Sequence, residues 1–203
     1  MSARPVRIAI FASGSGSNAQ ALIEYFNPYP EVTVGAIFTN RPKAGVISVG
    51  EAYRIPVYTF KKRTLYEETQ ILNALFTANI DLVVLAGFLL LMPPYLVKAF
   101  RGRIVNLHPA LLPNYGGKGM YGKAVHEAVK AHGDQQTGIT IHHVNEAYDE
   151  GQIIRQFTCE VDPVNDSAED IESRVHSLEH THYPPTVREV IEQEFDLDLT
   201  SKA

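Results

Sequence analysis

The sequence has little of what marks secreted, membrane-spanning or nucleic-acid-binding proteins. It contains one cysteine, Cys159, which cannot form an internal disulfide, and it opens without an apolar signal segment. A reducing cytoplasm is therefore the expected location. The longest apolar run, residues 82–92, contains Gly87 and is shorter than the roughly 20 residues that a transmembrane helix needs. With 18 basic against 23 acidic residues, the chain has no basic excess to bind a nucleic-acid backbone. We expect neither a membrane nor a nucleic acid as a main partner.

Apolar segments with the patterns of strands and helices alternate along the chain. At 203 residues and 45% hydrophobic composition, the sequence suits one domain spanning residues 1–203. Strands are predicted at residues 6–12, 32–39, 56–59, 82–85 and 103–107. Helical spacing between them predicts an α/β fold, with a mostly parallel, twisted, Rossmann-like sheet and helices on both of its faces. Residues 139–144 and 152–161 are predicted to form antiparallel strands around the turn at 145–151.

Capping patterns and prolines predict where helices begin and end. Residues 17–20, 64–67 and 167–170 each match a capping box, in which the first side chain caps the helix and the fourth bonds back to it. Helices are expected to start there, the second running to about Phe76. Further helices are expected at residues 43–53, 94–100 and 125–131. The pair Pro184-Pro185 is expected to break the last helix, because proline removes a backbone donor and clashes with the preceding turn.

Residues 13–18, Ser-Gly-Ser-Gly-Ser-Asn, directly follow the first predicted strand and precede the first helix. Such a turn brings several backbone N–H groups to the positive end of a helix, which suits a phosphate. The pattern is neither G-x-G-x-x-G nor a P-loop with lysine, so a dinucleotide or ATP is not indicated. A phosphomonoester is the better functional interpretation, and a tight turn without a ligand is the alternative.

Asn106 and His108 lie at the end of a predicted strand that stops at Pro109, and Asp149 follows the predicted strand 139–144. An amide donor, an imidazole and a carboxylate can together hold an oxyanion and move a proton. In parallel sheets, ligands bind beyond the carboxyl ends of the strands, where the 13–18 loop also lies. On composition alone, Asn-x-His-Pro is more often a capped turn than a catalytic site, so both interpretations stay open.

Six stretches together resemble the phosphoribosylglycinamide formyltransferase family, the folate-dependent enzymes of purine synthesis. They are residues 12–18, 84–88, 106–113, 137–142, 149–151 and 174–180. The resemblance implies a formyltransferase fold and transfer of the formyl group from 10-formyltetrahydrofolate, as cosubstrate, to the amine of glycinamide ribonucleotide. It implies no metal and leaves open whether the protein is a monomer or a homodimer.

The resemblance also implies roles for individual residues. Asn106, His108 and Asp149 would carry the chemistry. The substrate would be held by Gly16, Ser17, Asn18, Pro109 and Glu179, with the first three on its phosphate and Glu179 on its ribose. The folate would be held by Arg63 at its glutamate tail and, around the pterin, by Leu89, Leu90, Leu91, Met92, Asn106, Asn145, Glu146, Ala147 and Tyr148. Leu90, Ala110 and the long glycine-rich loop at 115–122 depart from the pattern of the family.

Other interpretations compete with this one. Residues 176–180 spell H-x-x-E-H, the inverted zinc-peptidase motif, but a zinc site needs a third protein ligand. A formyltetrahydrofolate hydrolase would share the catalytic residues but usually carries a regulatory domain, and methionyl-tRNA formyltransferase adds a C-terminal domain; we expect room for neither. A small-molecule sensor would keep the phosphate loop without the catalytic residues. His142 is expected to face inward and support the site, and Cys159 is expected to be a buried strand thiol.

Overall fold

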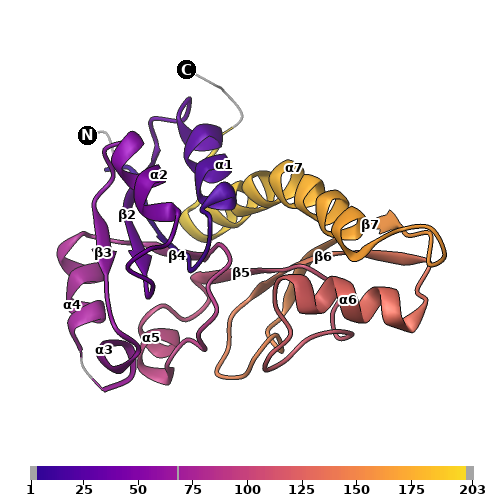
Figure 1. The fold of residues 1–203 in the computed structure, drawn as a ribbon. Coiled ribbons are helices and arrows are strands. Elements are labelled where there is room, and N and C mark those ends of the chain that lie inside the picture. The colour runs from indigo at the N-terminus through magenta and orange to yellow at the C-terminus, as the bar shows by residue number, and fades with distance from the viewer. Residues whose placement is uncertain (1–3, 68, 200–203) are drawn as a thin grey trace.

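The computed structural model describes residues 4–67 and 69–199, and its strands form one sheet in the order β3-β2-β1-β4-β5-β6-β7 (Figure 1). The strands are β1 (Val6–Phe11), β2 (Val32–Thr39), β3 (Val57–Thr59), β4 (Leu82–Leu85), β5 (Ile104–His108), β6 (Gln136–His143) and β7 (Ile153–Glu160). The first five run parallel, and β6 runs antiparallel to both β5 and β7. The predicted mostly parallel sheet with antiparallel strands near its C-terminal end is confirmed.

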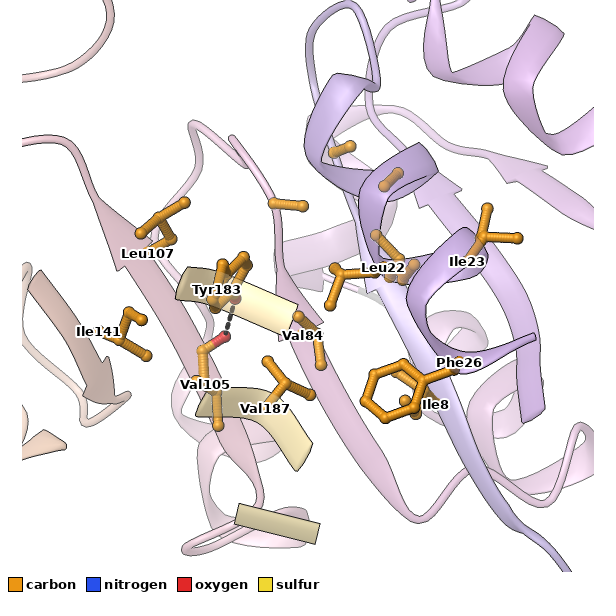
Figure 2. Close-up of a cluster of buried hydrophobic side chains, with 14 of the residues drawn as sticks. Ile8, Leu22, Ile23, Phe26, Val84, Val105, Leu107, Ile141, Tyr183 and Val187 are labelled. Carbon is orange, nitrogen blue, oxygen red and sulfur yellow. Dashed lines mark hydrogen bonds between the residues drawn. The ribbon is translucent and has the colours of Figure 1, made fainter. Parts of the chain in front are cut away.

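Helices cover both faces of this sheet, as expected. They are α1 (Ser17–Phe26), α2 (Val46–Ala52), α3 (Lys62–Glu67), α4 (Gln70–Thr77), α5 (Pro94–Ala99), α6 (Lys123–His132) and α7 (Ala168–Phe195). Alternation along β1 explains the two layers: Ile8 and Ile10 pack with α1 and α7, whereas Ala9 and Phe11 pack with α3, α4 and α5. Figure 2 shows the first of these layers, with Phe26 against Ile8. Within residues 4–67 and 69–199, no helix is long and apolar enough to cross a membrane.

Two of the three predicted capping boxes are wrong. Ser17 is the first residue of α1, and the N-cap position before it is Gly16, which as a glycine has no side chain to cap the helix. Thr64 lies inside α3, and the single helix predicted from there is two short helices, α3 and α4. The third box is confirmed: the Ser167 hydroxyl accepts from the Asp170 N–H while the Asp170 carboxylate accepts from the Ser167 N–H. A four-residue pattern is too short to exclude chance matches.

The predicted break at Pro184-Pro185 is also wrong, because α7 continues through both residues to Phe195. An internal proline costs an isolated helix about 3 kcal/mol or more. Here the helix is held by tertiary packing, since Val175, Tyr183 and Val187 are each fully buried against the sheet. Burial of each such side chain contributes about 1.5–3 kcal/mol, which outweighs the local preference.

The sheet places two of the three predicted catalytic side chains on a single face. Val105 and Leu107 of β5 point into the layer of α1 and α7, so Asn106 and His108 point to the opposite face. In the antiparallel register with β6, Asn106 lies opposite His142 and His108 lies opposite Thr140. The order of strands thus brings two polar residues of β5 beside an inward-facing histidine of β6.

The Tyr183 hydroxyl ties α7 to the strands that carry the site. It donates to the backbone carbonyls of Leu85 at 2.9 Å and of Val105 at 3.3 Å, and the second bond is drawn in Figure 2. Leu85 pairs with Asn106 across the parallel strands, and Val105 precedes Asn106 in β5. One buried hydroxyl therefore links both strands beside the predicted catalytic amide.

We predict that Tyr183→Phe lowers the free energy of unfolding by about 1–2 kcal/mol, because a buried hydroxyl and its two carbonyl acceptors lose their hydrogen bonds without any loss of ring packing. Urea denaturation measures the change. Tyr58→Phe is the control, since that side chain is 40% exposed and its substitution should change stability by less than about 0.5 kcal/mol. Equal effects of the two substitutions would contradict the assigned role.

Candidate active site

A cavity of about 590 Å³ lies at the carboxyl ends of the parallel strands. Its wall includes the 13–18 loop after β1, residues 86–90 after β4, residues 106–109 at the end of β5, and the glycine-rich loop at 117–122. Asp149 and, from α7, Glu172, His176 and Glu179 complete it. The structure therefore brings the predicted phosphate loop, the three predicted catalytic residues and Glu179 to one cavity.

The phosphate end of the cavity depends on Gly16. Its φ of 90° is left-handed, and a Cβ placed there would lie 2.7 Å from the Val46 Cα. Glycine is thus required both by backbone conformation and by the close approach of α2. Ser17 and Asn18, the first residues of α1, line the cavity. The N–H groups in the first turn of a helix have no partner within the helix, and the helix dipole favours an anion there.

Glu179 lies beside this loop and is 5% exposed. Its carboxylate accepts a hydrogen bond of 2.8 Å from the Asn18 side chain. Burial raises the pKa of Glu179, although the Asn18 bond acts in the opposite direction. The two residues are 161 positions apart in the sequence. Their contact fixes the distance between the start of α1 and the middle of α7.

Asn106 is oriented by His142. The Asn106 amide lies 3.1 Å from His142 Nε2, and the other ring nitrogen of His142 lies 2.8 Å from the carbonyl oxygen of His143. A ring nitrogen that faces a carbonyl must carry the proton, so Nε2 accepts from the Asn106 amide. The amide also donates to Asp149 Oδ1 over a longer distance of 3.5 Å. The expectation that His142 faces inward is confirmed, since it is 2% exposed.

His108 is held between a carbonyl and a carboxylate. Its Nε2 lies 2.8 Å from the backbone oxygen of Tyr115, and its Nδ1 lies 3.6 Å from Asp149 Oδ2. Nε2 therefore carries the proton and donates it in a hydrogen bond to the Tyr115 carbonyl, and Nδ1 is the nitrogen that faces Asp149. Burial lowers the pKa of His108 below its ordinary value despite the nearby carboxylate. The resting imidazole is consequently neutral at neutral pH.

Asp149 has a φ of 57°, a conformation that Asp and Asn adopt more readily than most residues. Its Oδ2 accepts from the Gly117 N–H at 2.9 Å, and its Oδ1 lies 3.7 Å from His142 Nε2. Burial alone would raise the pKa of Asp149, but the hydrogen bonds that its carboxylate accepts, including that from the Gly117 N–H, outweigh this effect, so the pKa lies below the ordinary value. The carboxylate remains ionised beside a neutral His108.

A second, smaller cavity of about 60 Å³ adjoins the first. Five residues line both cavities: Phe88, Leu90, Asn106, Tyr148 and Asp149. Leu91, Met92 and Ala147 line the smaller cavity, and Leu89 lines the larger one. Most of the residues predicted to hold a folate are thus gathered where the two cavities meet.

Three residues predicted to hold folate lie elsewhere in the described structure. Arg63 has a side chain that is 76% exposed and pairs with Glu67 at 2.9 Å, and it lines neither cavity; its neighbour Lys62 lines the larger one. Asn145 and Glu146 line neither cavity as well, and the Asn145 side chain accepts from the Ala147 N–H at 3.0 Å. Asn145 therefore shapes the turn that carries Tyr148 and Asp149.

The sequence did not single out several residues that the structure places at this site. Tyr115 and Gly117 contact the predicted catalytic residues through backbone atoms, which leave no signal in a sequence. His126 lines the cavity, is 1% exposed, and its Nδ1 has no hydrogen-bond partner among the described residues. A histidine near the start of a helix that follows a glycine-rich loop was the available signal. Arg41 lines the phosphate end.

The H-x-x-E-H segment is not arranged as a zinc site. His176 and His180 are both exposed on α7, whereas Glu179 between them is buried. In the part of the chain that the structure describes, no three His, Cys, Asp or Glu side chains are grouped so as to hold a metal ion. The motif thus reflects helical spacing around Glu179.

Comparison with known proteins decides the family. The model of the formyl transferase family matches residues 6–187. The chain belongs to the formyl transferase family. A family member from Bacillus subtilis, named phosphoribosylglycinamide formyltransferase, is 35% identical over 91% of this chain and 94% of its own length. A chloroplastic protein of the same name from Arabidopsis thaliana is 38% identical over 94% of this chain and 67% of its own length.

Solved structures of the family agree with the fold. The crystal structure of phosphoribosylglycinamide formyltransferase from Bacillus halodurans matches this chain with a TM-score of 0.83 at 33% identity, covering 96% of this chain and 100% of that one. That of the same enzyme from Anaplasma phagocytophilum has a TM-score of 0.82 at 32% identity, covering 90% of this chain and 84% of the other. The Rossmann-like formyltransferase fold predicted from the sequence is confirmed.

The buried imidazoles predict how stability changes with pH. Burial lowers the pKa of His108 and of His126 in the folded protein. At a pH between the ordinary histidine pKa of about 6.5 and these lowered folded-state pKa values, the unfolded chain binds protons at the two histidines that the folded chain does not. The free energy of unfolding should therefore fall as pH drops from 7.5 to 5.5, measured by urea denaturation. Asp149 acts at lower pH: because its folded-state pKa is depressed, its contribution to stability begins to fall below about pH 4 and is lost as pH drops through that depressed pKa. His126→Asn, which cannot titrate, should show a smaller fall, and an unchanged pH dependence would contradict this assignment.

Proposed function

We propose that this chain transfers the formyl group of 10-formyltetrahydrofolate to the amine of glycinamide ribonucleotide. The observation that carries the proposal is the position of Asn106 and Asp149 where the two cavities meet, with His108 and the glycine-containing turn of residues 13–18 in the wall of the larger cavity. A reaction between two substrates needs such an arrangement, because each must enter from its own side and present its reacting atom to the same groups. The relatives' shared name supports the same two substrates.

The larger cavity suits glycinamide ribonucleotide. Its phosphate would bind the N–H groups of residues 16–18, with the cation of Arg41 nearby in the cavity wall. Glu179 and Asn18 would bind the ribose hydroxyls, since a buried carboxylate can accept two hydroxyl protons. Pro109 lines the path from there to His108, so its carbonyl would guide the glycyl amine toward the centre.

The smaller cavity suits the pterin of the folate. Leu90, Leu91, Met92 and Ala147 supply apolar walls, and backbone groups of the 89–92 and 145–148 segments would contact the ring. At about 60 Å³ the cavity holds a few water molecules, so the 145–148 turn must shift to admit a bicyclic ring. Lys62, which lines the larger cavity, is a better placed cation for a glutamate tail than Arg63 in this conformation.

The chemistry follows from the hydrogen bonds at the centre. As the amine attacks the formyl carbon, a C–N bond forms and the carbonyl oxygen becomes an oxyanion. Asn106 would donate to it with the N–H that now makes its long bond to Asp149. His108, which is neutral at rest with its proton on Nε2, would take up a second proton at Nδ1 from water when the substrates bind. It would then donate to the oxyanion through Nδ1, because Nε2–H is already bound to Tyr115. Asp149 would take the proton of the attacking nitrogen, directly or through water, and the folate nitrogen would gain one as its bond to carbon breaks.

Other properties of the protein remain predictions. A cytoplasmic location, a single formyltransferase domain over residues 1–203, and a monomer or homodimer are compatible with this function. We propose no metal in the reaction, because an oxyanion can be stabilised by Asn106 and His108 alone.

We predict that Asn106→Ala, His108→Ala and Asp149→Asn each lower kcat by roughly 100- to 1,000-fold while changing KM for either substrate much less. The reason is that these groups act on charge that develops in the transition state. Steady-state kinetics of formyl transfer measures both constants. Near-normal kcat in Asp149→Asn would remove Asp149 from the chemistry.

The same assay separates the alternatives. Loss of the formyl group from the folate should depend on glycinamide ribonucleotide, and folate turnover at the same rate without the amine would favour a formyltetrahydrofolate hydrolase. Absence of turnover despite binding of the phosphate compound would favour a sensor.

We further predict that Gly16→Ala raises KM for glycinamide ribonucleotide at least tenfold with a smaller change in KM for the folate. The added Cβ would meet Val46 and must push the turn away from its present path. Gly102→Ala is the matched control, since Gly102 also has a positive φ, 73°, but lies outside both cavities. A similar rise in KM for both variants would show that general strain, rather than the phosphate turn, is responsible.

A further inference from the structure

Tyr115 is fixed at both its side chain and its backbone. Its hydroxyl donates to Asp134 Oδ2 at 2.5 Å, and its ring packs edge-on against the His132 ring with centroids 5.8 Å apart. His132 is the last residue of α6, and Asp134 follows it by two positions. Burial and the bond to Asp134 raise the pKa of Tyr115 to about 12, so the hydroxyl stays protonated and remains a donor at physiological pH.

The backbone of Tyr115 is in a conformation that a large side chain rarely adopts. Its φ is 54°, in the left-handed region, where a non-glycine side chain is strained. Such a conformation persists where the surroundings hold it. At Tyr115 the Asp134 carboxylate and the His132 ring, at and just after the end of α6, hold the side chain, which also packs against the hydrophobic core.

The strained backbone carries two contacts to the proposed catalytic residues. The Tyr115 carbonyl faces His108 Nε2 at 2.8 Å, and two residues later the Gly117 N–H donates to Asp149 Oδ2 at 2.9 Å. The backbone at the intervening Gly116 is closely packed, since a Cβ there would lie 2.7 Å from Leu112 and 3.4 Å from Asp149. This segment therefore has little room to move without shifting its neighbours. Rotation of Tyr115 toward an ordinary φ would move both the carbonyl and the N–H.

We propose that Tyr115 and Asp134 form a clamp that positions His108 and Asp149 from outside the substrate cavities, an inference that rests on the proposed function. Neither clamp residue lines either cavity. Their contact holds the Tyr115 carbonyl where it accepts the hydrogen bond from His108 Nε2–H. His108 therefore keeps one tautomer and presents Nδ1 to Asp149 and the reacting atoms. Tyr115 and Asp134 are therefore positioning residues, which act through His108 and Asp149.

A positioning role for Tyr115 and Asp134 predicts effects on kcat that a contribution to folding stability alone would not produce. Tyr115→Phe and Asp134→Ala should each lower kcat about tenfold and leave KM for both substrates within about twofold. A catalytic group misplaced by about 1 Å can lose roughly 100-fold in rate, and loss of the clamp should move His108 and Asp149 by less than that. The double variant should lose no more than either single variant, because both break the same contact. Asp134→Asn keeps an acceptor for the hydroxyl and should retain most of the activity. Rates are measured well below the Tm of each variant.

The tautomer of His108 gives a second readout, independent of activity. In protein with 15N-labelled histidine at about pH 8, the His108 ring of the unsubstituted protein should give the shifts of the Nε2–H tautomer, with His108→Asn identifying its signals. Tyr115→Phe and Asp134→Ala should show a mixture of both tautomers. Tyr53→Phe is the matched control: its hydroxyl also bonds a carboxylate, Glu24, at 2.5 Å, but away from both cavities.

An unchanged tautomer in Tyr115→Phe, or losses of kcat that multiply in the double variant, would overturn the clamp. Equal loss of kcat in Tyr53→Phe would also do so, because it would trace the effect to stability alone. The unsubstituted protein separates this outcome from failure of the proposed function. If it does not formylate glycinamide ribonucleotide, the proposed function fails, while the comparison of tautomers still tests the clamp.

Discussion

The carboxylate of Asp149 must stay charged inside the protein, and much of the site is organised to make that possible. Its side chain is 12% exposed, so burial disfavours the ionised form. Donors reach it from separate parts of the chain: the Asn106 amide from β5 and the Gly117 N–H from the glycine-rich loop, with the His108 and His142 rings close by. A buried charge that loses such partners is strongly destabilising. The two strands and the two loops therefore have to be assembled together.

The long helix α7 performs the corresponding task at the substrate end. Glu179 and Tyr183 are one turn apart on its buried face, so a single rigid element contacts the phosphate turn through Asn18 and the strand carbonyls beside Asn106. A bend at Pro184 would disturb both contacts. The continuity of α7 through its two prolines thus links the place where the substrate is held to the place where it reacts.

Much of the architecture could be predicted because its signals are local. The apolar strands β1, β2 and β4 are continuous runs, and the 13–18 loop follows β1 directly, so the sheet and its binding edge can be inferred from spacing. Asn106 and Asp149, 43 positions apart, could be placed together because strand ends gather at one edge. The family resemblance added Glu179, which lies four residues after Val175 at the border of the buried helical stripe; its bond to Asn18 is not indicated by any local pattern.

The parts that could not be predicted depend on long-range contacts. Tyr115 gives no sign in the sequence that Asp134 will hold it in a left-handed conformation, and the false capping boxes at Ser17 and Thr64 have the same residue types as the true one at Ser167. At Pro184 the packing of Tyr183 overrides the local rule. Arg63 lies on the exposed side of the short helix α3, where its side chain pairs with Glu67, and no sequence pattern indicates which way such an exposed side chain points.

The distances at the centre divide into two groups, and the division has a chemical meaning. Contacts that tie the three residues to their surroundings are short: 3.1 Å from Asn106 to His142, 2.8 Å from His108 to Tyr115 and 2.9 Å from Gly117 to Asp149. Contacts among the three are long, 3.5 Å from Asn106 and 3.6 Å from His108 to the Asp149 carboxylate. Short bonds fix the geometry before any ligand arrives, whereas long bonds cost little to replace. A formyl oxygen that takes the place of Asp149 at the long Asn106 contact would meet an amide that is already oriented, so little reorganisation is needed as its charge develops.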